Sequence, residues 1–181
     1  MDKIVFITGA SSGIGAGCAR KFASQGASLI LNARNVNKLS ALKEELEKQY
    51  GAKIYLLPFD VRDRKAATSA LESLPKEWQS IDILVNNAGL VIGTDKEQEG
   101  SLDEWDIVID TNIKALLAMT RLIVPGMVER KRGHIINIGS IAGDAAYPGG
   151  SVYCATKAAV KALSDGPVSY THLTLPTNRE V

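Results

Sequence analysis

Two side chains near the end of the sequence could share a proton-transfer reaction. Tyr153 and Lys157 are four residues apart, so in a helix they lie on one face, a turn apart. A free tyrosine has a pKa of about 10 and is a poor base at neutral pH unless a nearby cation stabilises its phenolate. Lys157 can supply that charge, and Ser140 could donate a hydrogen bond to a substrate carbonyl or alkoxide. Alone, such a Tyr-Lys pair is more often an exposed helix pair.

A glycine-rich segment follows the first apolar run of the chain. Its candidate phosphate-binding residues are Gly9, Ser11, Ser12, Gly13, Ile14 and Gly15. Glycines let the backbone turn tightly and approach a pyrophosphate, and a following helix offers unpaired N–H groups to the anion. A nucleoside-triphosphate loop is disfavoured, because that motif requires a lysine after its last glycine. The alternative is that the glycines only permit a helix to pack on a sheet.

The end of the second predicted strand bears on the choice of dinucleotide. The chain there reads Asn32, Ala33, Arg34, with no acidic residue. In dinucleotide-binding folds an acidic residue at this point binds the ribose 2′-OH of NAD, whereas an arginine accommodates the 2′-phosphate of NADP. We therefore predict NADP, with Arg34 as the phosphate partner; the alternative is a solvated arginine at the start of a helix.

The elements that must position these residues alternate between strand and helix. Short β-rich runs predict strands at 4–7, 28–31, 53–59, 81–85 and 134–138. Helical periodicity and stop signals predict helices at 14–25, 36–50, 64–74, 102–129 and from 151. The apolar face of the first helix is expected to hold Ile14, Cys18, Phe22 and Ala23. The alternation predicts an α/β fold, a doubly wound parallel sheet of Rossmann type in three α/β/α layers.

Composition excludes several classes of protein. A length of 181 residues, 45% of them hydrophobic and 23% charged, favours one globular domain over a disordered chain. The net charge of +1 provides no field to attract nucleic acid or a membrane surface. Cys18 and Cys154 indicate no disulfide framework and favour the cytoplasm. Two histidines and two scattered cysteines predict no metal site, so we interpret Cys154 as apolar filler and His134 as structural.

Taken together, the motifs resemble the classical short-chain dehydrogenase/reductase family. The matching positions are 8–15, 86–89, Asn112, Ser140, Tyr153 and Lys157. The resemblance implies that Tyr153 is the general acid/base, that Lys157 lowers its pKa and binds the nicotinamide ribose, and that both contact the cofactor. It also implies that Ser140 orients the substrate and that Asn112 holds a water in a proton relay. The further cofactor contacts that it implies are Asp60 and Val61 beside the adenine, and Asn87, Ala88 and Gly89 along the channel.

Structural alternatives remain for some of these residues. Asp60 could cap the next helix, residues 86–89 could form only a turn, and Asn112 could be a polar residue at a helix bend.

Longer segments resemble one branch of this family. Residues 74–90 and 127–140 are similar to the NADP-dependent 3-hydroxy acid dehydrogenases, which oxidise serine, L-allo-threonine and related acids. Tyr147 matches the substrate-side loop of that branch, although ordinary packing could also explain it. The resemblance implies reversible hydride transfer between NADP and a small 3-hydroxy acid, in a homodimer or homotetramer. The alternatives are a 3-oxoacyl-[acyl-carrier-protein] reductase, a general carbonyl reductase, or an inactive nucleotide-binding fragment.

The last fifteen residues depart from the pattern. Residues 167–181 hold two prolines and no helical face, and they resemble translated sequencing-adapter sequence. We therefore expect a C-terminally truncated domain at 1–166 that lacks the last two strands and the substrate lid of the family, followed by a non-native tail. The missing sixth strand is expected to expose the edge of the fifth, and the shortened last helix is expected to weaken the oligomer. Such a chain is also expected to bind NADP poorly, to aggregate or to lack activity.

Overall fold

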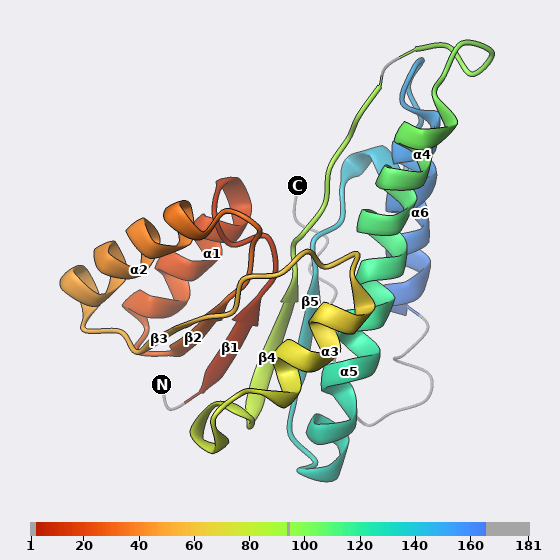
Figure 1. Ribbon diagram of the computed structural model, residues 1–181. Helices are drawn as coiled ribbons and strands as arrows, with labels where there is room; N and C mark the ends of the chain where they lie inside the picture. Colours follow the sequence, from red (N-terminus) through yellow and green to blue (C-terminus); the bar gives the residue numbers. More distant parts are fainter. Residues whose placement is uncertain (1–2, 94, 166–181) are drawn as a thin grey trace.

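The computed structural model describes residues 3–93 and 95–165 and places five parallel strands in one sheet (Figure 1). The strands are β1 (Ile4–Ile7), β2 (Ser28–Leu31), β3 (Ile54–Leu56), β4 (Ile81–Asn86) and β5 (His134–Asn137). Their order across the sheet is β3-β2-β1-β4-β5, and each neighbouring pair is parallel. The chain therefore reverses its direction of winding between β1 and β4, which is where ligands bind in open α/β sheets. The predicted tail at 167–181 lies outside the described residues.

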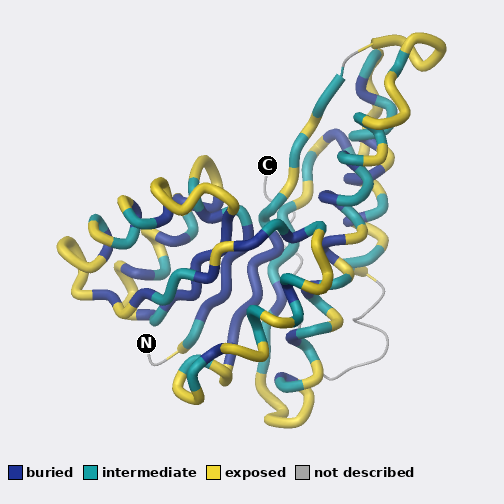
Figure 2. The backbone as a smooth tube through the Cα atoms, viewed as in Figure 1, coloured by how far each residue is buried: buried dark blue, intermediate teal, exposed yellow. Residues whose placement is uncertain are grey.

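Helices cover both faces of the sheet, as predicted. In Figure 1, α1 (Gly13–Ser24) and α2 (Val36–Tyr50) lie on one face, and α3 (Arg64–Glu72), α5 (Leu116–Glu129) and α6 (Ser151–Asp165) lie on the other. Successive strand residues point to opposite faces, so Val5 and Ile7 enter the core beneath α1 and α2, whereas Phe6 enters the core beneath α3 and α5. Figure 2 shows β1, β2 and β4 as mostly buried between the helices, whereas the edge strands β3 and β5 are largely intermediate. The doubly wound three-layer α/β fold is confirmed.

The limits of α2 follow from two local signals. Its N-cap residue is Asn35, whose side chain accepts a hydrogen bond from the N–H of Lys38. Its C-cap is Gly51 with φ +62°, the left-handed conformation that glycine adopts without a steric penalty. The predicted helix at 36–50 is therefore confirmed at both ends.

The prediction for the buried face of α1 is wrong at Ile14. The structure buries Gly15, Ala16, Ala19 and Ala23, and it leaves Ile14 62% exposed. Small side chains let α1 approach the sheet closely, whereas Ile14 lies in the first turn, beyond the carboxyl ends of the strands. Apolar periodicity alone places a residue on a face but does not show how far the sheet extends beneath that face.

The predicted helix at 102–129 is continuous but not regular. It consists of α4 (Leu102–Ile109), a π-helical turn η2 (Asp110–Ala115) and α5. Two short 3₁₀ turns, η1 (Lys76–Trp78) and η3 (Ile141–Gly143), complete the described elements. The sequence carries no clear signal for a π turn, and such turns occur frequently at functional sites. Among the described residues, no helix is long and apolar enough to cross a membrane.

Candidate active site

A cavity of about 940 Å³ opens at the carboxyl ends of the strands. Its walls come from the segments that follow β1 to β5 and from α6. The predicted site residues that line it are Gly9, Ser11, Ser12, Gly13, Ile14, Arg34, Asp60, Val61, Asn87, Ala88, Gly89, Tyr153 and Lys157. The fold thus brings together residues that are more than 140 positions apart in the sequence. Gly15, Asn112, Ser140 and Tyr147 are predicted site residues that do not line this cavity.

The three glycines of the first loop have different environments. A Cβ on Gly15 would lie 2.4 Å from the main-chain oxygen of Gly9, and a Cβ on Gly9 would lie 2.9 Å from Nδ2 of Asn87. Gly13 has φ +53° and open space around the position of a Cβ. Close packing therefore explains Gly15, and close packing together with a φ of +63° explains Gly9. Gly13 matches the interpretation of a backbone left open to a ligand.

The start of α1 fits an anionic ligand. Its N-cap residue, Ser12, makes no side-chain capping bond, whereas Asn35, Asp63 and Ser101 cap α2, α3 and α4. The first N–H groups of α1 consequently receive no side-chain acceptor, and they lie beside Ser11 and Ser12 at the cavity wall. A pyrophosphate there would accept their hydrogen bonds and interact favourably with the helix dipole.

Asn87 joins the glycine loop to the end of β4. Its Nδ2 donates hydrogen bonds to the main-chain oxygens of Thr8, at 2.9 Å, and Gly9, at 3.1 Å. The hydroxyl of Thr8 in turn accepts hydrogen bonds from the N–H groups of Asn87 and Ala88, both at 3.0 Å. Residues 86–89 are therefore more than a turn, because Asn87 and Ala88 join the end of β4 to the end of β1 beneath the cavity.

Charged residues cluster at the end of the cavity near β2 and β3. Arg62 binds Asp60 through Nη2 to Oδ2 at 2.7 Å and through its main-chain N–H to Oδ1 at 3.0 Å. These hydrogen bonds lower the pKa of the Asp60 carboxyl. Arg34, with its side chain 67% exposed, lies 3.9 Å from the same carboxylate. Asp60 does not cap α3, because Asp63 does so.

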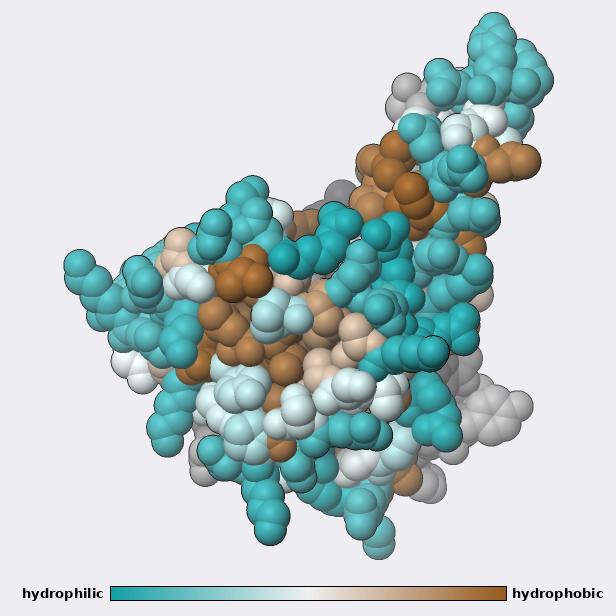
Figure 3. All heavy atoms as spheres, viewed as in Figure 1, coloured by the Kyte–Doolittle hydropathy of each residue, from teal (hydrophilic) through white to brown (hydrophobic). Residues whose placement is uncertain are grey.

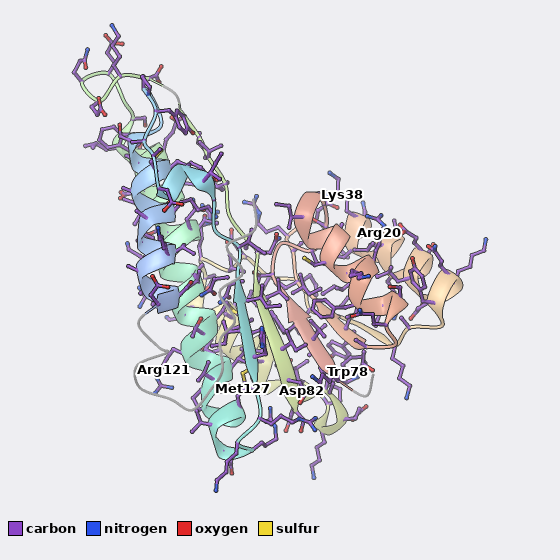
Figure 4. All side chains as sticks on the ribbon, turned by 180° about the vertical axis from the view of Figure 1, so that it is seen from behind. Arg20, Lys38, Trp78, Asp82, Arg121 and Met127 are labelled. Carbon is purple, nitrogen blue, oxygen red and sulfur yellow. The ribbon has the colours of Figure 1, made fainter. Side chains whose placement is uncertain are left out.

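Sequence reasoning missed two cations of this cluster. Lys38 and Arg62 also line the cavity, and Figure 4 shows Lys38 at the end of the α1–α2 pair nearest the carboxyl ends of the strands. A lysine in the first turn of a helix faces the positive end of the dipole, and α2 has no acidic residue in that turn. This unfavourable position of Lys38 could have been recognised in the sequence. A bound anion would offset the repulsion between the lysine and the helix dipole.

Tyr153 and Lys157 lie one turn apart on α6, as predicted. Nζ of Lys157 lies 5.9 Å from the ring centroid of Tyr153 and donates a hydrogen bond to the main-chain oxygen of Ile138 at 2.8 Å. Lys157 is only 8% exposed, and this burial lowers its pKa. The alternative of an exposed helix pair is wrong. Tyr153 also borders a small hollow formed with residues of the 92–105 and 149–152 segments.

Asn112 lies in η2, behind the cavity wall. It is 2% exposed, and its amide makes two hydrogen bonds to Leu90: Nδ2 donates to the main-chain oxygen, and Oδ1 accepts from the main-chain N–H, both at 2.9 Å. The second N–H of its amide donates to Oγ1 of Thr156 at 3.1 Å. Asn112 is thus more than a residue at a helix bend, because it fixes a segment that borders the cavity.

The two predicted substrate contacts outside the cavity lie in the segment between β5 and α6. Oγ of Ser140 accepts a hydrogen bond from the N–H of Ala142 at 3.2 Å and so caps η3. Its own proton can still be donated to another acceptor. Tyr147 is 42% exposed, and its ring packs so closely on Gly150 that a Cβ there would lie 2.2 Å from it. Apolar residues gather where the projecting arm of the molecule meets its body (Figure 3). Val91, in the segment after β4, is 50% exposed.

The remaining predictions concern the cysteine, the histidine and metals. Cys154 is 4% exposed, which agrees with its interpretation as filler. His134 begins β5, and burial together with the charge of Lys3 lowers its pKa. Within residues 3–93 and 95–165, no group of three or more metal-ligating side chains comes together.

Comparison with known proteins identifies the family of this chain. The family model described as short chain dehydrogenase matches residues 3–167. The NADP-dependent 3-hydroxy acid dehydrogenase YdfG of Escherichia coli K12 is 50% identical over 161 residues, which cover 89% of this chain and 63% of that protein. The NADP-dependent 3-hydroxy acid dehydrogenase of Schizosaccharomyces pombe is 45% identical over 159 residues, covering 87% and 61%. The chain therefore spans less than two thirds of the length of these relatives.

Solved structures give the same result. Serine dehydrogenase from Escherichia coli superposes with a TM-score of 0.88 at 47% identity, over 95% of this chain and 78% of that one. The closed form of serine dehydrogenase complexed with NADP⁺ gives a TM-score of 0.87 at 47% identity, over 93% and 66%. With the family model matched over almost the whole chain, and with the glycine loop, Tyr153 and Lys157 around one cavity, this chain belongs to the short chain dehydrogenase family.

Proposed function

We propose that the chain carries the cofactor site and the proton-transfer residues of an NADP-dependent oxidoreductase. Its substrate would be a small 3-hydroxy acid such as serine or L-allo-threonine, oxidised at the carbon that bears the hydroxyl. The observation that carries the proposal is that Tyr153 and the buried Lys157 share one cavity with the uncapped start of α1. The relatives named as 3-hydroxy acid and serine dehydrogenases, at 45–50% identity, support the substrate class.

The proposed cofactor contacts follow the cavity from end to end. The N–H groups at the start of α1 would bind the pyrophosphate, and Arg34 with Lys38 would bind the 2′-phosphate. Asp60 and Val61 would flank the adenine, with the Asp60 carboxylate held in place by Arg62. Residues 87–89 would line the path to the nicotinamide. NADP⁺, when bound, supplies the acceptor for the hydride that leaves the substrate carbon.

The remaining chemistry is proton transfer by the chain itself. Tyr153 takes the proton of the substrate hydroxyl during oxidation and returns it during reduction. Lys157 places a cation within 5.9 Å of the Tyr153 ring and would bind the nicotinamide ribose. Ser140 donates a hydrogen bond to the developing oxyanion, and Tyr147 contacts the substrate from the same loop. The water contact expected of Asn112 stays a prediction; its amide N–H groups are both occupied by Leu90 and Thr156.

A conservative change at Tyr153 tests the proposal. Tyr153→Phe should keep the increase in Tm on addition of NADP and reduce kcat by orders of magnitude, because only the phenolic proton carrier is removed. Tyr50→Phe is the matched control, since Tyr50 ends α2, away from the cavity. A mild loss of kcat in Tyr153→Phe, comparable to that in Tyr50→Phe, would refute the assignment.

A substrate panel separates the related activities. Serine, L-allo-threonine and 3-hydroxypropionate are compared with acetoacetyl thioesters, because a 3-oxoacyl-[acyl-carrier-protein] reductase from Brucella melitensis also superposes, at 31% identity and a TM-score of 0.85. Preference for the thioester would favour that activity or a general carbonyl reductase. A Tm shift with NADP but no turnover of any compound would favour a nucleotide-binding fragment. Homodimer or homotetramer formation and a cytoplasmic location stay predictions.

A further inference from the structure

Thr156 lies between Tyr153 and Lys157 on α6, and it has a hydroxyl buried from solvent. The residue is 1% exposed. Its Oγ1 donates to the main-chain oxygen of Tyr153 at 2.7 Å and accepts from Nδ2 of Asn112 at 3.1 Å. A hydroxyl has one proton, and that of Thr156 is donated to the main-chain oxygen of Tyr153. In the contact with Asn112, the Thr156 hydroxyl can therefore only accept.

Hydrogen bonds also connect Asn112 to the cavity wall. The Asn112 amide holds both the N–H and the carbonyl of Leu90, each at 2.9 Å, and Leu90 lines the cavity. Three segments from separate parts of the sequence, namely α6, η2 and the segment after β4, are thus joined through two buried side chains.

The same segments converge at a second point. A Cβ on Gly89 would lie 3.3 Å from Oδ1 of Asn112 and 3.7 Å from Nζ of Lys157. Gly89 therefore lies close to both Asn112 and Lys157. The Thr156 hydroxyl opposes a separation of α6 from η2, because that separation would leave a buried amide N–H of Asn112 without an acceptor.

We propose that Thr156 is a positioning residue for the proton-transfer pair. Its hydroxyl sets the distance of Tyr153 and Lys157 from the wall formed by Gly89 and Leu90, against which the reacting end of the cofactor would lie. Thr156 itself contacts neither cofactor nor substrate; it acts through Asn112 and the α6 backbone. The expected effect on turnover rests on the proposed function. The hydrogen-bonded link from Thr156 through Asn112 to Leu90 does not depend on it.

Two substitutions and one matched control test the inference. Thr156→Val removes the hydroxyl at nearly constant volume, and Thr156→Ser keeps it. Thr120→Val is the control, because Oγ1 of Thr120 also accepts a hydrogen bond from a buried asparagine, Nδ2 of Asn86 at 3.0 Å, but from α5 and outside the cavity lining. Both valine variants should lower Tm to a similar extent.

Kinetics should separate the two valine variants. We expect Thr156→Val to reduce kcat about tenfold or more with little change in KM for NADP, because small displacements of reacting groups have large effects on rate. Thr156→Ser should stay within about twofold of the parent in kcat, and Thr120→Val should match the parent. The inference is wrong if both valine variants lose kcat equally, or if Thr156→Ser is as impaired as Thr156→Val.

Hydrogen exchange tests the link without any substrate. The Leu90 amide should exchange faster in Thr156→Val than in Thr120→Val, since its acceptor on Asn112 is less firmly held. Absence of turnover in the parent with every substrate would overturn the proposed function alone. Unchanged exchange at Leu90 in Thr156→Val would overturn the positioning role.

Discussion

The ammonium group of Lys157 donates a hydrogen bond of 2.8 Å to the main-chain oxygen of Ile138, which connects α6 to the end of β5. Both residues line the cavity, so this bond fixes the position of a buried cation relative to the sheet. Such an arrangement favours function over stability, because a charge removed from water disfavours the folded state.

Replacement of Lys157 by methionine should reveal this cost through its pH dependence. Burial lowers the pKa of Lys157, so near pH 10 the unfolded chain binds more protons at this residue than the folded chain does. The penalty is complete below the folded pKa and is relieved as pH rises toward the unfolded value. Relative to the parent, the Tm of Lys157→Met should therefore fall from pH 7 to pH 10. Loss of the hydrogen bond to Ile138 lowers the Tm of Lys157→Met by a similar amount at every pH, so it does not produce this trend.

Thermal denaturation across that pH range provides the measurement. Lys21→Met is the control, because Lys21 is exposed in the last turn of α1 and should show no such trend. A difference in Tm between Lys157→Met and the parent that stays constant with pH would contradict the prediction.

Lys38 should contribute to the preference for NADP over NAD. Lys38→Ala is expected to weaken NADP binding about tenfold and to leave NAD binding nearly unchanged, because only NADP carries the 2′-phosphate. Binding can be measured directly by titration, independently of turnover. Lys48→Ala is the matched control, since Lys48 lies in the last turn of the same helix, away from the cavity. Equal NADP:NAD affinity ratios in the two variants would exclude Lys38 from the phosphate site.

Asp82 should be important for stability at the amino ends of the strands, the end of the sheet opposite the cavity (Figure 4). It is 4% exposed, accepts a hydrogen bond from the Ile4 N–H at 3.0 Å, and pairs with Arg132 at 2.7 Å. Asp82→Ala leaves the Ile4 N–H without an acceptor and should reduce the free energy of unfolding by about 2 kcal/mol. Arg132→Ala should cost less than about 1 kcal/mol, because the arginine side chain is 63% exposed. Urea denaturation measures both, and an equal loss would show that the ion pair dominates.

Gly143 should be required for the contact between η3 and α6. A Cβ there would lie 2.8 Å from the main-chain carbon and oxygen of Lys157, which are backbone atoms of the helix that carries Tyr153. Gly143→Ala should therefore lower both Tm and kcat. Gly17→Ala should instead raise the free energy of unfolding by up to about 1 kcal/mol, because Gly17 lies in α1 with open space around it. Gly143→Ala with parental Tm and kcat would show that η3 adjusts freely.

Much of the fold could be predicted because its signals are local. The limits of α2 follow from Asn35 and Gly51, and the β-rich runs mark every described strand, although β3 ends three residues before the predicted 59. Predictions that needed knowledge of neighbouring elements were less successful. Ile14 has the correct periodicity for a buried face, yet it lies beyond the sheet and is exposed.

By itself, the sequence determined which elements form and which residue types carry the chemistry, since strand and helix periodicity, caps and short motifs depend on neighbours along the chain. On that basis it indicated Arg34 as a phosphate partner and Tyr153 with Lys157 as the proton-transfer pair. Only the tertiary structure decided that Lys38 and Arg62 join Arg34, and that Thr156 reaches Leu90 through Asn112. Those relationships depend on the crossover of the chain between β1 and β4 and on the packing of α6 against η2, which bring distant residues together through contacts that no local pattern encodes.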